Sequence, residues 1–139
     1  MHAVDTNVLV YSIDKHDRIK RAKARKLLND LRTGSTPTYL MWQVAGELSS
    51  QLQNWQDHGR IKRTAVRRYV TLFRRLFSLV LPTPHVIDLA LDPSKRYSLS
   101  HWDSMLVAAC VEAQAVKLCT ENMGAPRTIG SLELVNPFI

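Results

Sequence analysis

Short apolar runs alternate along the chain with longer segments in which apolar side chains recur at helical spacing. We predict strands from the short runs at residues 2–5, 37–40, 79–81, 116–119 and 132–135. We predict helices from the longer segments at residues 7–13, 19–31, 41–55, 66–77, 86–90 and 102–113. This alternation favours a parallel sheet with helices on both faces. The expected fold class is therefore α/β: one domain over residues 1–139, an α/β/α sandwich around a central parallel sheet of about five short strands.

Glycine, proline and serine residues mark the ends of several predicted helices. Gly34 and Gly59 stop two of the helical patterns, and a shorter helix is expected before Pro93. Ser100 is a suitable N-cap for the last helix. We expect that helix to bury some combination of five side chains, which are Trp102, Met105, Leu106, Ala109 and Ala113.

Three acidic side chains stand where a predicted strand ends or a predicted helix begins. Asp5 follows the first strand, Glu47 lies one turn inside a helix, and Asp103 lies in the first turn of another. Ligands of open α/β sheets bind beyond the carboxyl ends of the strands. We therefore expect the three acids to converge at one edge of the sheet, although they are far apart in the sequence. Glu121 and Asn122 follow the fourth strand and should reach the same edge.

Two of these acids also have a purely structural interpretation. Asp5 is suited to cap the helix that follows it, although Thr6 and Asn7 are equally good caps. Asp103 stands three residues after Ser100, in an arrangement close to a capping box, where the helix dipole favours a negative charge. For Asp5 the site role is favoured, because the cap does not require it. Asp103 taken alone is better explained as part of the cap, and its site role is favoured only when it is considered with the other acids.

Glu47 has the weakest structural explanation. Exposed helical glutamates often pair with a basic residue three or four positions later, but Ser50 and Gln51 occupy those positions here. Glu47 also borders the apolar stripe that contains Val44 and Leu48. An unpaired acid beside a buried face is costly unless a cation meets it, so this position predicts a bound metal ion.

The overall charge favours an anionic partner. The chain carries 19 Lys and Arg against 12 Asp and Glu, a formal charge of +7. The basic residues concentrate in residues 15–32 and 60–75, where few acids are interleaved. The plain alternative is two solvated helix faces. A basic surface around an acidic pocket suits a metal-dependent enzyme that acts on a nucleic acid, because it attracts phosphates while the pocket holds cations.

Several other classes of site and protein are disfavoured. Cys110 and Cys119 both lie in apolar runs, as reduced core residues of a cytoplasmic protein do, so we expect no disulfide. The start of the sequence has no cationic and apolar signal-peptide pattern, and the longest apolar run is too short to span a membrane, so we expect neither a signal peptide nor a membrane-spanning segment. No histidine pair has zinc-ligand spacing, and we find no glycine-rich phosphate loop or nucleophile elbow.

The sequence resembles the PIN domain, and specifically the VapC-like toxins of bacterial toxin–antitoxin pairs, over nearly the whole chain. The order and spacing of five segments carry the resemblance: Asp5-Thr6-Asn7, Gln43-Val44-Ala45-Gly46-Glu47, Leu99-Ser100-His101-Trp102-Asp103-Ser104 running into Ala108-Ala109, Thr120-Glu121-Asn122-Met123, and Val135-Asn136-Pro137-Phe138. The resemblance implies a Mg²⁺- or Mn²⁺-dependent endoribonuclease with an RNA substrate. It also implies inhibition by a cognate antitoxin, and homodimers.

The same resemblance implies a role for each site residue. Asp5, Glu47 and Asp103 match the acidic metal site of the family. We expect Asp5 and Asp103 to be direct ligands, because hard divalent cations prefer oxygen donors. Glu47 would bind the metal through water or orient the attacking water, which the metal activates. The residues expected to organise the site are Thr6, Asn7 and Thr120.

Asn122 departs from the family pattern. Toxins of this type usually read Thr-Glu-Asp where this chain reads Thr120-Glu121-Asn122, so a fourth acid has become an amide. Asn122 can still act through its carbonyl oxygen or through water, but it adds no charge. We therefore expect activity to depend mainly on one tightly held ion. The alternative is a catalytically weak or inactive PIN-like module that binds RNA or an antitoxin. A basic DNA-binding regulator is a third possibility, but no helix-turn-helix or ribbon signature supports it.

Overall fold

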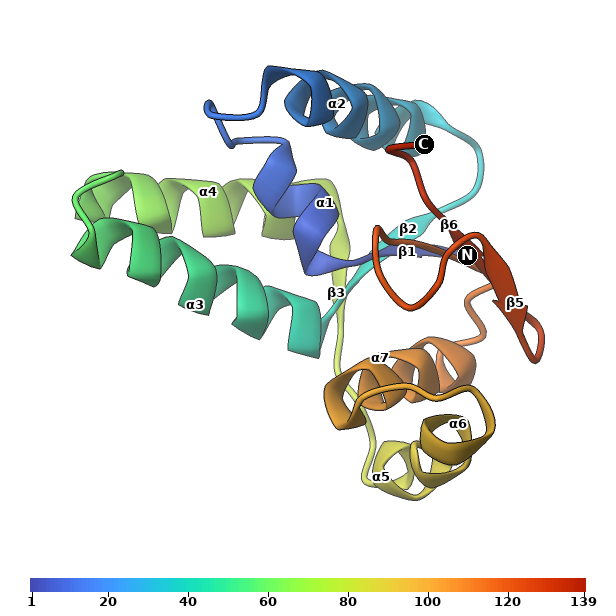
Figure 1. Cartoon of the computed structure of the whole chain (residues 1–139). Helices are drawn as coiled ribbons and strands as arrows, with labels where there is room; N and C mark the ends of the chain where they lie inside the picture. Colours follow the sequence, from blue (N-terminus) through green and yellow to red (C-terminus); the bar gives the residue numbers. More distant parts are fainter.

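One sheet of six strands runs through the computed structural model, which describes residues 1–139 (Figure 1). Its strands are β1 (His2–Val4), β2 (Thr38–Met41), β3 (Ser78–Val80), β4 (Lys117–Cys119), β5 (Arg127–Ile129) and β6 (Leu132–Val135). They lie in the order β3-β2-β1-β4-β6-β5, and every neighbouring pair is parallel except β5 with β6. The predicted α/β class with a largely parallel sheet is confirmed, with one strand more than expected.

The additional strand, β5, forms an antiparallel hairpin with β6. Ile129 pairs with Leu132 across a two-residue turn at Gly130 and Ser131. Gly130 has a φ of 58°, a left-handed conformation that glycine adopts without steric cost. Only Ile129 of the three β5 residues is buried, so this strand has no apolar run by which the sequence could predict it.

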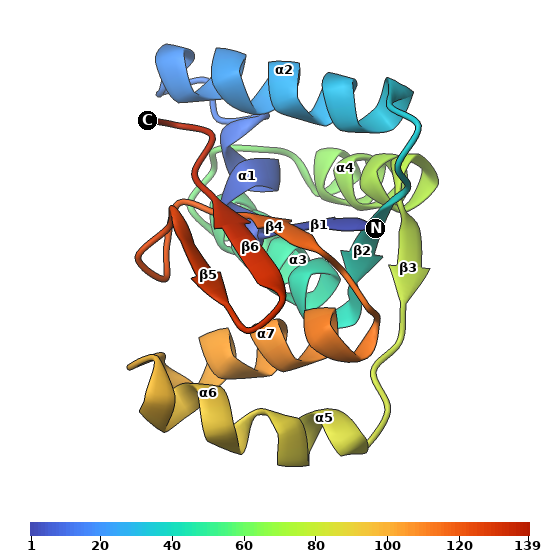
Figure 2. The ribbon, with the colours of Figure 1, turned by 90° about the vertical axis from the view of Figure 1, so that its right-hand side faces the viewer.

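Seven helices cover the two faces of the sheet. They are α1 (Thr6–Tyr11), α2 (Arg18–Thr33), α3 (Trp42–Asp57), α4 (Arg63–Leu76), α5 (His85–Leu89), α6 (Leu91–Arg96) and α7 (His101–Glu112). Figure 2 shows α1, α2 and α4 on one side of the sheet and α5, α6 and α7 on the other. The α3–α4 hairpin projects beyond the carboxyl ends of the strands, on the side where β1 leads into α1 (Figure 1).

The core lies between the sheet and these helices. A main cluster of 25 buried apolar residues fills it, and a second cluster of 4 lies between α5 and α7. The helix α3 contributes Val44, Leu48, Leu52 and Trp55, which recur at helical spacing and were predicted to share one face. Burying a side chain of this size contributes roughly 1.5–3 kcal/mol. Both cysteines are buried and free, as expected, and burial raises the pKa of Cys110 to about 12 and that of Cys119 to about 11.

The structure refines three local predictions. The first strand ends at Val4 rather than at residue 5, and Asp5 follows it as the N-cap of α1. A short helix, α5, lies before Pro93 as predicted, but Pro93 itself lies in the first turn of a further helix, α6, where proline is tolerated. Of the five candidate side chains of α7, Leu106 and Ala109 are buried, whereas Trp102 is 63% exposed. In addition, no helix in the structure has the length and apolar character needed to cross a bilayer.

Candidate functional site

Asp5 lies at the junction of β1 and α1, where it combines two roles. One carboxylate oxygen, Oδ1, accepts a hydrogen bond from the Thr6 backbone at 2.7 Å and so caps α1. The other, Oδ2, accepts from the Thr120 hydroxyl at 2.7 Å and from the Asn7 amide at 3.2 Å. The residue is only 5% exposed. The capping and site interpretations of Asp5 are therefore compatible, because different oxygens serve each.

The pairing of β1 with β4 brings Asp5 and Thr120 together. Val4 is in register with Cys119, so the next residue on each strand lies at the same sheet edge. Thr120 is fully buried, and its hydroxyl also accepts a hydrogen bond from the Asn122 backbone at 3.0 Å. Asn7 completes the arrangement, because its amide oxygen accepts from the Glu121 backbone at 3.2 Å. The structure therefore confirms that the carboxyl ends of the first and fourth strands meet at this edge.

The electrostatic environment disfavours an isolated charge on Asp5. Burial is the main factor that raises the pKa of this carboxyl, and the negative charges of Glu47 and Asp103 raise it further. The hydrogen bonds from Thr120 and Thr6 lower the pKa and partly offset these effects. All three acids therefore contribute to one negative region, in which a cation would stabilise the ionised form of Asp5.

Glu47 lies in the second turn of α3, on the exposed side of the helix. Its Oε2 accepts from the Thr6 hydroxyl at 2.8 Å, and its Oε1 accepts from the Gln43 amide at 2.8 Å. As the sequence indicated, Glu47 lies beside the buried Val44 and Leu48 and pairs with no Lys or Arg. Its carboxylate is nevertheless exposed and accepts two hydrogen bonds from neutral groups. Thr6 connects two of the acids, since its backbone contacts Asp5 and its hydroxyl contacts Glu47.

Asp103 lies half-buried in the first turn of α7. Its backbone N–H donates to the Ser100 hydroxyl at 3.2 Å, so the predicted N-cap is present. Its carboxylate accepts no hydrogen bond from the protein and keeps its oxygen lone pairs free. The Gln43 amide donates to the backbone carbonyl of the preceding residue, Trp102, at 2.9 Å and thereby joins α3 to α7. Gln43 has no predicted role of its own in the sequence, although its position four residues before Glu47 is a usable signal for this contact.

The residues that follow Thr120 have separate environments. Asn122 is exposed, and its side chain makes no hydrogen bond within the protein. Glu121 forms an ion pair with Lys20, whose ammonium also contacts the Tyr11 hydroxyl at 3.2 Å and lies 4.6 Å from the centre of that ring. The hydrogen bond to Glu121 is the main cause that raises the pKa of Lys20. Glu121 is therefore engaged, whereas the Asn122 amide is free to turn towards the site.

The donor chemistry of this edge fits a hard divalent cation. Asp103 has free carboxylate oxygens, and Asp5 lies in a negative region whose charge a cation would neutralise. No group of three His, Cys, Asp or Glu side chains encloses a complete metal site in this arrangement. Mg²⁺ does not require such a cage, since it keeps several waters and binds one or two carboxylates together with substrate phosphates.

Comparisons with known proteins agree on one fold. The family model described as the PIN domain matches residues 3–128. Among curated proteins, none matches the chain in sequence.

Three solved structures illustrate the likeness. A toxin–antitoxin complex from Klebsiella pneumoniae has a TM-score of 0.68 at 16% identity, covering 99% of this chain and 98% of that one. VapBC2 from Rickettsia felis, bound to a DNA fragment from its promoter, has a TM-score of 0.69 at 15% identity, covering 96% of each chain. VapC20 from Mycobacterium tuberculosis, a toxin that cleaves the sarcin-ricin loop, has a TM-score of 0.65 at 14% identity, covering 85% of this chain and 87% of that one.

Proposed function

This chain belongs to the PIN domain family, and we propose that it is a metal-dependent endoribonuclease, the toxin of a toxin–antitoxin pair. The main support for the proposal is the proximity of three carboxylates that come from the β1–α1 junction, from α3 and from the start of α7. The charges of Glu47 and Asp103 both raise the pKa of the buried Asp5. A structural role in the fold does not require three like charges to be brought together, whereas a cation site does.

The donor set supports Mg²⁺ or Mn²⁺ as the cofactor. When bound, such an ion would polarise the scissile phosphate of RNA and lower the pKa of a coordinated water. Asp5 and Asp103 would hold the ion, Asp5 in an orientation fixed by Thr120 and Thr6. Glu47, held by Thr6 and Gln43, would orient the attacking water and accept its proton. Thr120 and Asn7 act through Asp5 and keep its carboxylate in place.

The cations of α2 are largely occupied within the protein. Lys20 pairs with Glu121, Lys26 pairs with Asp30, and Arg25 donates to the Ser12 carbonyl at 2.8 Å. These residues contribute to the net charge but have limited freedom to contact a phosphate. The sequence alone could not show which basic residues are paired within the protein, because it gives their positions in the chain but not their contacts.

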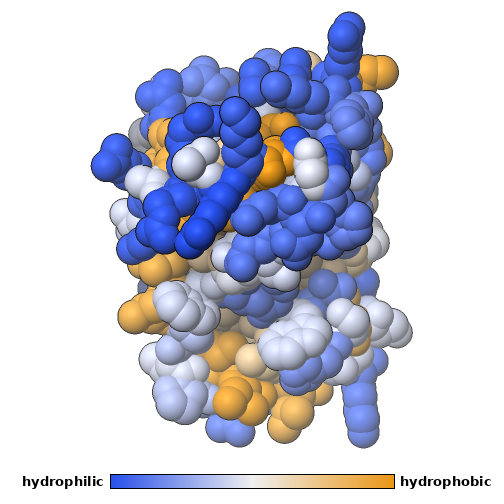
Figure 3. Space-filling view, turned by 90° about the vertical axis from the view of Figure 1, so that its left-hand side faces the viewer, coloured by the Kyte–Doolittle hydropathy of each residue, from blue (hydrophilic) through white to orange (hydrophobic).

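The arginines of α4, in contrast, have no polar partner within the protein. All five are exposed, and none forms an ion pair or a hydrogen bond with the protein: Arg63, Arg67, Arg68, Arg74 and Arg75. Four of the five, together with two threonines, line one shallow surface hollow. Figure 3 views the side on which the α3–α4 hairpin projects and shows hydrophilic side chains gathered over the upper part of that face. We assign the phosphate contacts of the RNA chiefly to α4.

A cognate antitoxin and self-association belong to the same proposal. The structures with similar folds include toxin–antitoxin complexes from Klebsiella pneumoniae and nontypeable Haemophilus influenzae, which supports an antitoxin partner. Exposed apolar side chains at Leu81, Ile87 and Leu91 support a homodimer, since such groups are often covered in an assembly. Sedimentation of the purified chain, with and without a co-expressed partner, tests both.

The proposal is tested in cells by expressing the wild type and Asp5→Asn in parallel. We expect the wild type to arrest growth and to cut RNA at a small set of sites, and the variant to do neither. Wild-type protein that accumulates without arrest or cleavage would favour the alternative, an inactive PIN-like module that binds RNA or an antitoxin. Asn122 is the residue that keeps this alternative open, because its side chain adds no charge to the acidic edge.

A further inference from the structure

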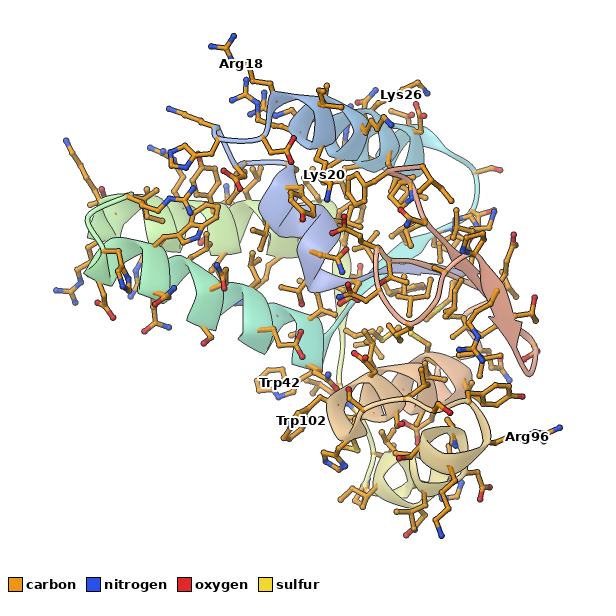
Figure 4. The ribbon with its side chains drawn as sticks, in the orientation of Figure 1. Arg18, Lys20, Lys26, Trp42, Arg96 and Trp102 are labelled. Atoms are coloured by element: carbon orange, nitrogen blue, oxygen red, sulfur yellow. The ribbon has the colours of Figure 1, made fainter.

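Two exposed tryptophans stand beside the acidic edge and take no part in the function described above. Trp42, the first residue of α3, is 56% exposed, and Trp102, next to Asp103 in α7, is 63% exposed. The third tryptophan, Trp55, is 5% exposed. Figure 4 shows Trp42 and Trp102 at the adjoining starts of α3 and α7. Indoles exposed in this way contribute little to the core and are typical of binding surfaces.

Both indoles line a cavity of about 490 Å³ that opens next to the acids. Gln43 and Glu47 form part of its wall, so the cavity is continuous with the candidate catalytic site. The remaining wall is mostly apolar, from Met41, Val80, Val86, Met105 and Ala109. Pockets of this size and lining accept a flat organic group and fix it with a few polar contacts.

The helices that carry the two indoles are joined at their starts. The Gln43 amide donates to both the Glu47 carboxylate and the Trp102 backbone carbonyl, which ties the helix that carries Trp42 to the helix that carries Trp102. The His101 ring packs edge-to-face on Trp102, with centroids 4.7 Å apart. A side chain restricted by such a contact loses less side-chain entropy when a ligand stacks on it, which favours Trp102 as the main stacking group.

The charges around the cavity indicate which part of a nucleotide it would take. No Lys or Arg lines the cavity, and its two charged residues, Glu47 and Glu112, are acids that would repel a phosphate. Glu112 is held by the Thr83 backbone at 3.1 Å and by the Thr83 hydroxyl. A carboxylate in this position can accept from the amino group of a base. The free arginines that suit phosphates lie on α4 instead.

We propose that Trp42 and Trp102 form a subsite that stacks on one unpaired nucleobase of the RNA, next to the bond that is cut. This inference rests on the proposed ribonuclease function and adds a base-binding element to it. Recognition of single-stranded RNA commonly uses aromatic side chains that stack on splayed bases. The subsite also makes the enzyme prefer unpaired loops to duplexes, because a base in a helix is not available to stack.

The test uses Asp5→Asn protein, which cannot cleave, as the parent for binding measurements with short labelled single-stranded RNAs. Trp102→Ala and Trp42→Ala in this parent should each weaken binding roughly 5- to 150-fold, as expected for loss of one base–aromatic stack. Trp102→Phe should retain most of the affinity, and Val116→Ala, which truncates another exposed apolar side chain, should retain all of it. RNA should quench the tryptophan emission of the parent, with a smaller quench in either alanine variant.

A second arm removes one base at a time from the RNA. If Trp102 stacks on a base, one abasic position should weaken binding to the parent and leave binding to the Trp102→Ala variant unchanged. Alanine variants that bind every RNA as tightly as the parent would overturn the subsite. Variants that convert a dimer to a monomer while RNA affinity is unchanged would also overturn it and identify the face as an interface between copies. If the wild-type protein cleaves RNA, either of these results contradicts the base-stacking subsite but leaves the proposed ribonuclease function intact. If the wild type neither binds nor cleaves RNA, the proposed function is contradicted as well.

Discussion

Replacing Thr120 by valine removes one hydroxyl from the centre of the site while keeping the shape of the side chain. The Thr120 hydroxyl is fully buried, donates to Asp5 at 2.7 Å and accepts from the Asn122 backbone at 3.0 Å. Hydrogen bonds to a charged group contribute about 1.5–3 kcal/mol, so we expect Thr120→Val to lower the free energy of unfolding at pH 7 by about that amount. For a domain of 139 residues this corresponds to a melting temperature lower by about 5–10 °C.

The effect should depend on pH in a defined direction. The pKa of Asp5 is raised in the folded protein, so ionisation of this group lowers stability as the pH rises from its ordinary value of 3.8 through the folded pKa. The Thr120 bond stabilises the ionised form and opposes that loss. Removing the hydroxyl should therefore destabilise the protein more at pH 7 than at pH 3.5, which lies below the ordinary value of 3.8, so that most of the Asp5 carboxyl is protonated in both states.

Calorimetry of the wild type, Thr120→Val and Thr120→Ser at both pH values measures this. Serine keeps the hydroxyl and loses one methyl group, so it controls for packing, which should lower stability by about 1 kcal/mol at either pH. Metal affinity should also fall by about 10- to 100-fold in the valine variant alone, because the group that orients the Asp5 ligand is lost. A valine variant that matches the serine variant in stability, pH dependence and metal affinity would refute this description of the site.

Three further outcomes follow from the same contacts. Asp5→Asn should abolish cleavage yet raise the melting temperature at pH 7, since it removes a buried negative charge that lies near two others. A melting temperature below that of the wild type at pH 7 would contradict this, as would an increase in melting temperature that persists near pH 3.8. Asn122→Asp should add a second, weaker Mg²⁺-binding step in titration calorimetry, where the wild type shows mainly one; two equal and tight steps in the wild type would contradict it. Replacing Arg67 and Arg75 by alanine should reduce the slope of log affinity for RNA against log salt by about 0.7 for each arginine, and an unchanged slope would exclude α4 as the phosphate-binding helix.

The convergence of the site residues could be predicted because it depends on chain topology. Parallel strands place their carboxyl ends at one edge of the sheet, so Asp5 and Thr120, each following a strand, had to lie close together. The Ser100 cap could likewise be predicted, because the residues that form it are three positions apart. These features are either local or imposed by the whole sheet.

Other features depend on contacts between distant residues and could not be predicted. The hydroxyl of Thr6 donates to Glu47 from 41 positions away, so no pattern near Glu47 in the sequence indicates this partner. The pattern of α7 leaves open which of its five candidate side chains is uncovered, because the helix has no clear apolar and polar faces; the structure leaves Trp102 exposed. The strand β5 exists only as the partner of β6, and its own residues carry no strand signal.

The most direct test of the central claim is cleavage of single-stranded RNA by the purified chain, freed of any bound partner, with Mg²⁺ or Mn²⁺. We predict that the wild type cleaves an RNA loop, that EDTA stops cleavage and added metal restores it, and that Asp5→Asn and Asp103→Asn are both inactive. Asp30→Asn is the matched control, because it removes an exposed acid that pairs with Lys26 far from the site, and it should cleave like the wild type. Cleavage that continues in EDTA, or that survives in Asp5→Asn, would contradict the assignment of this acidic edge as the catalytic metal site.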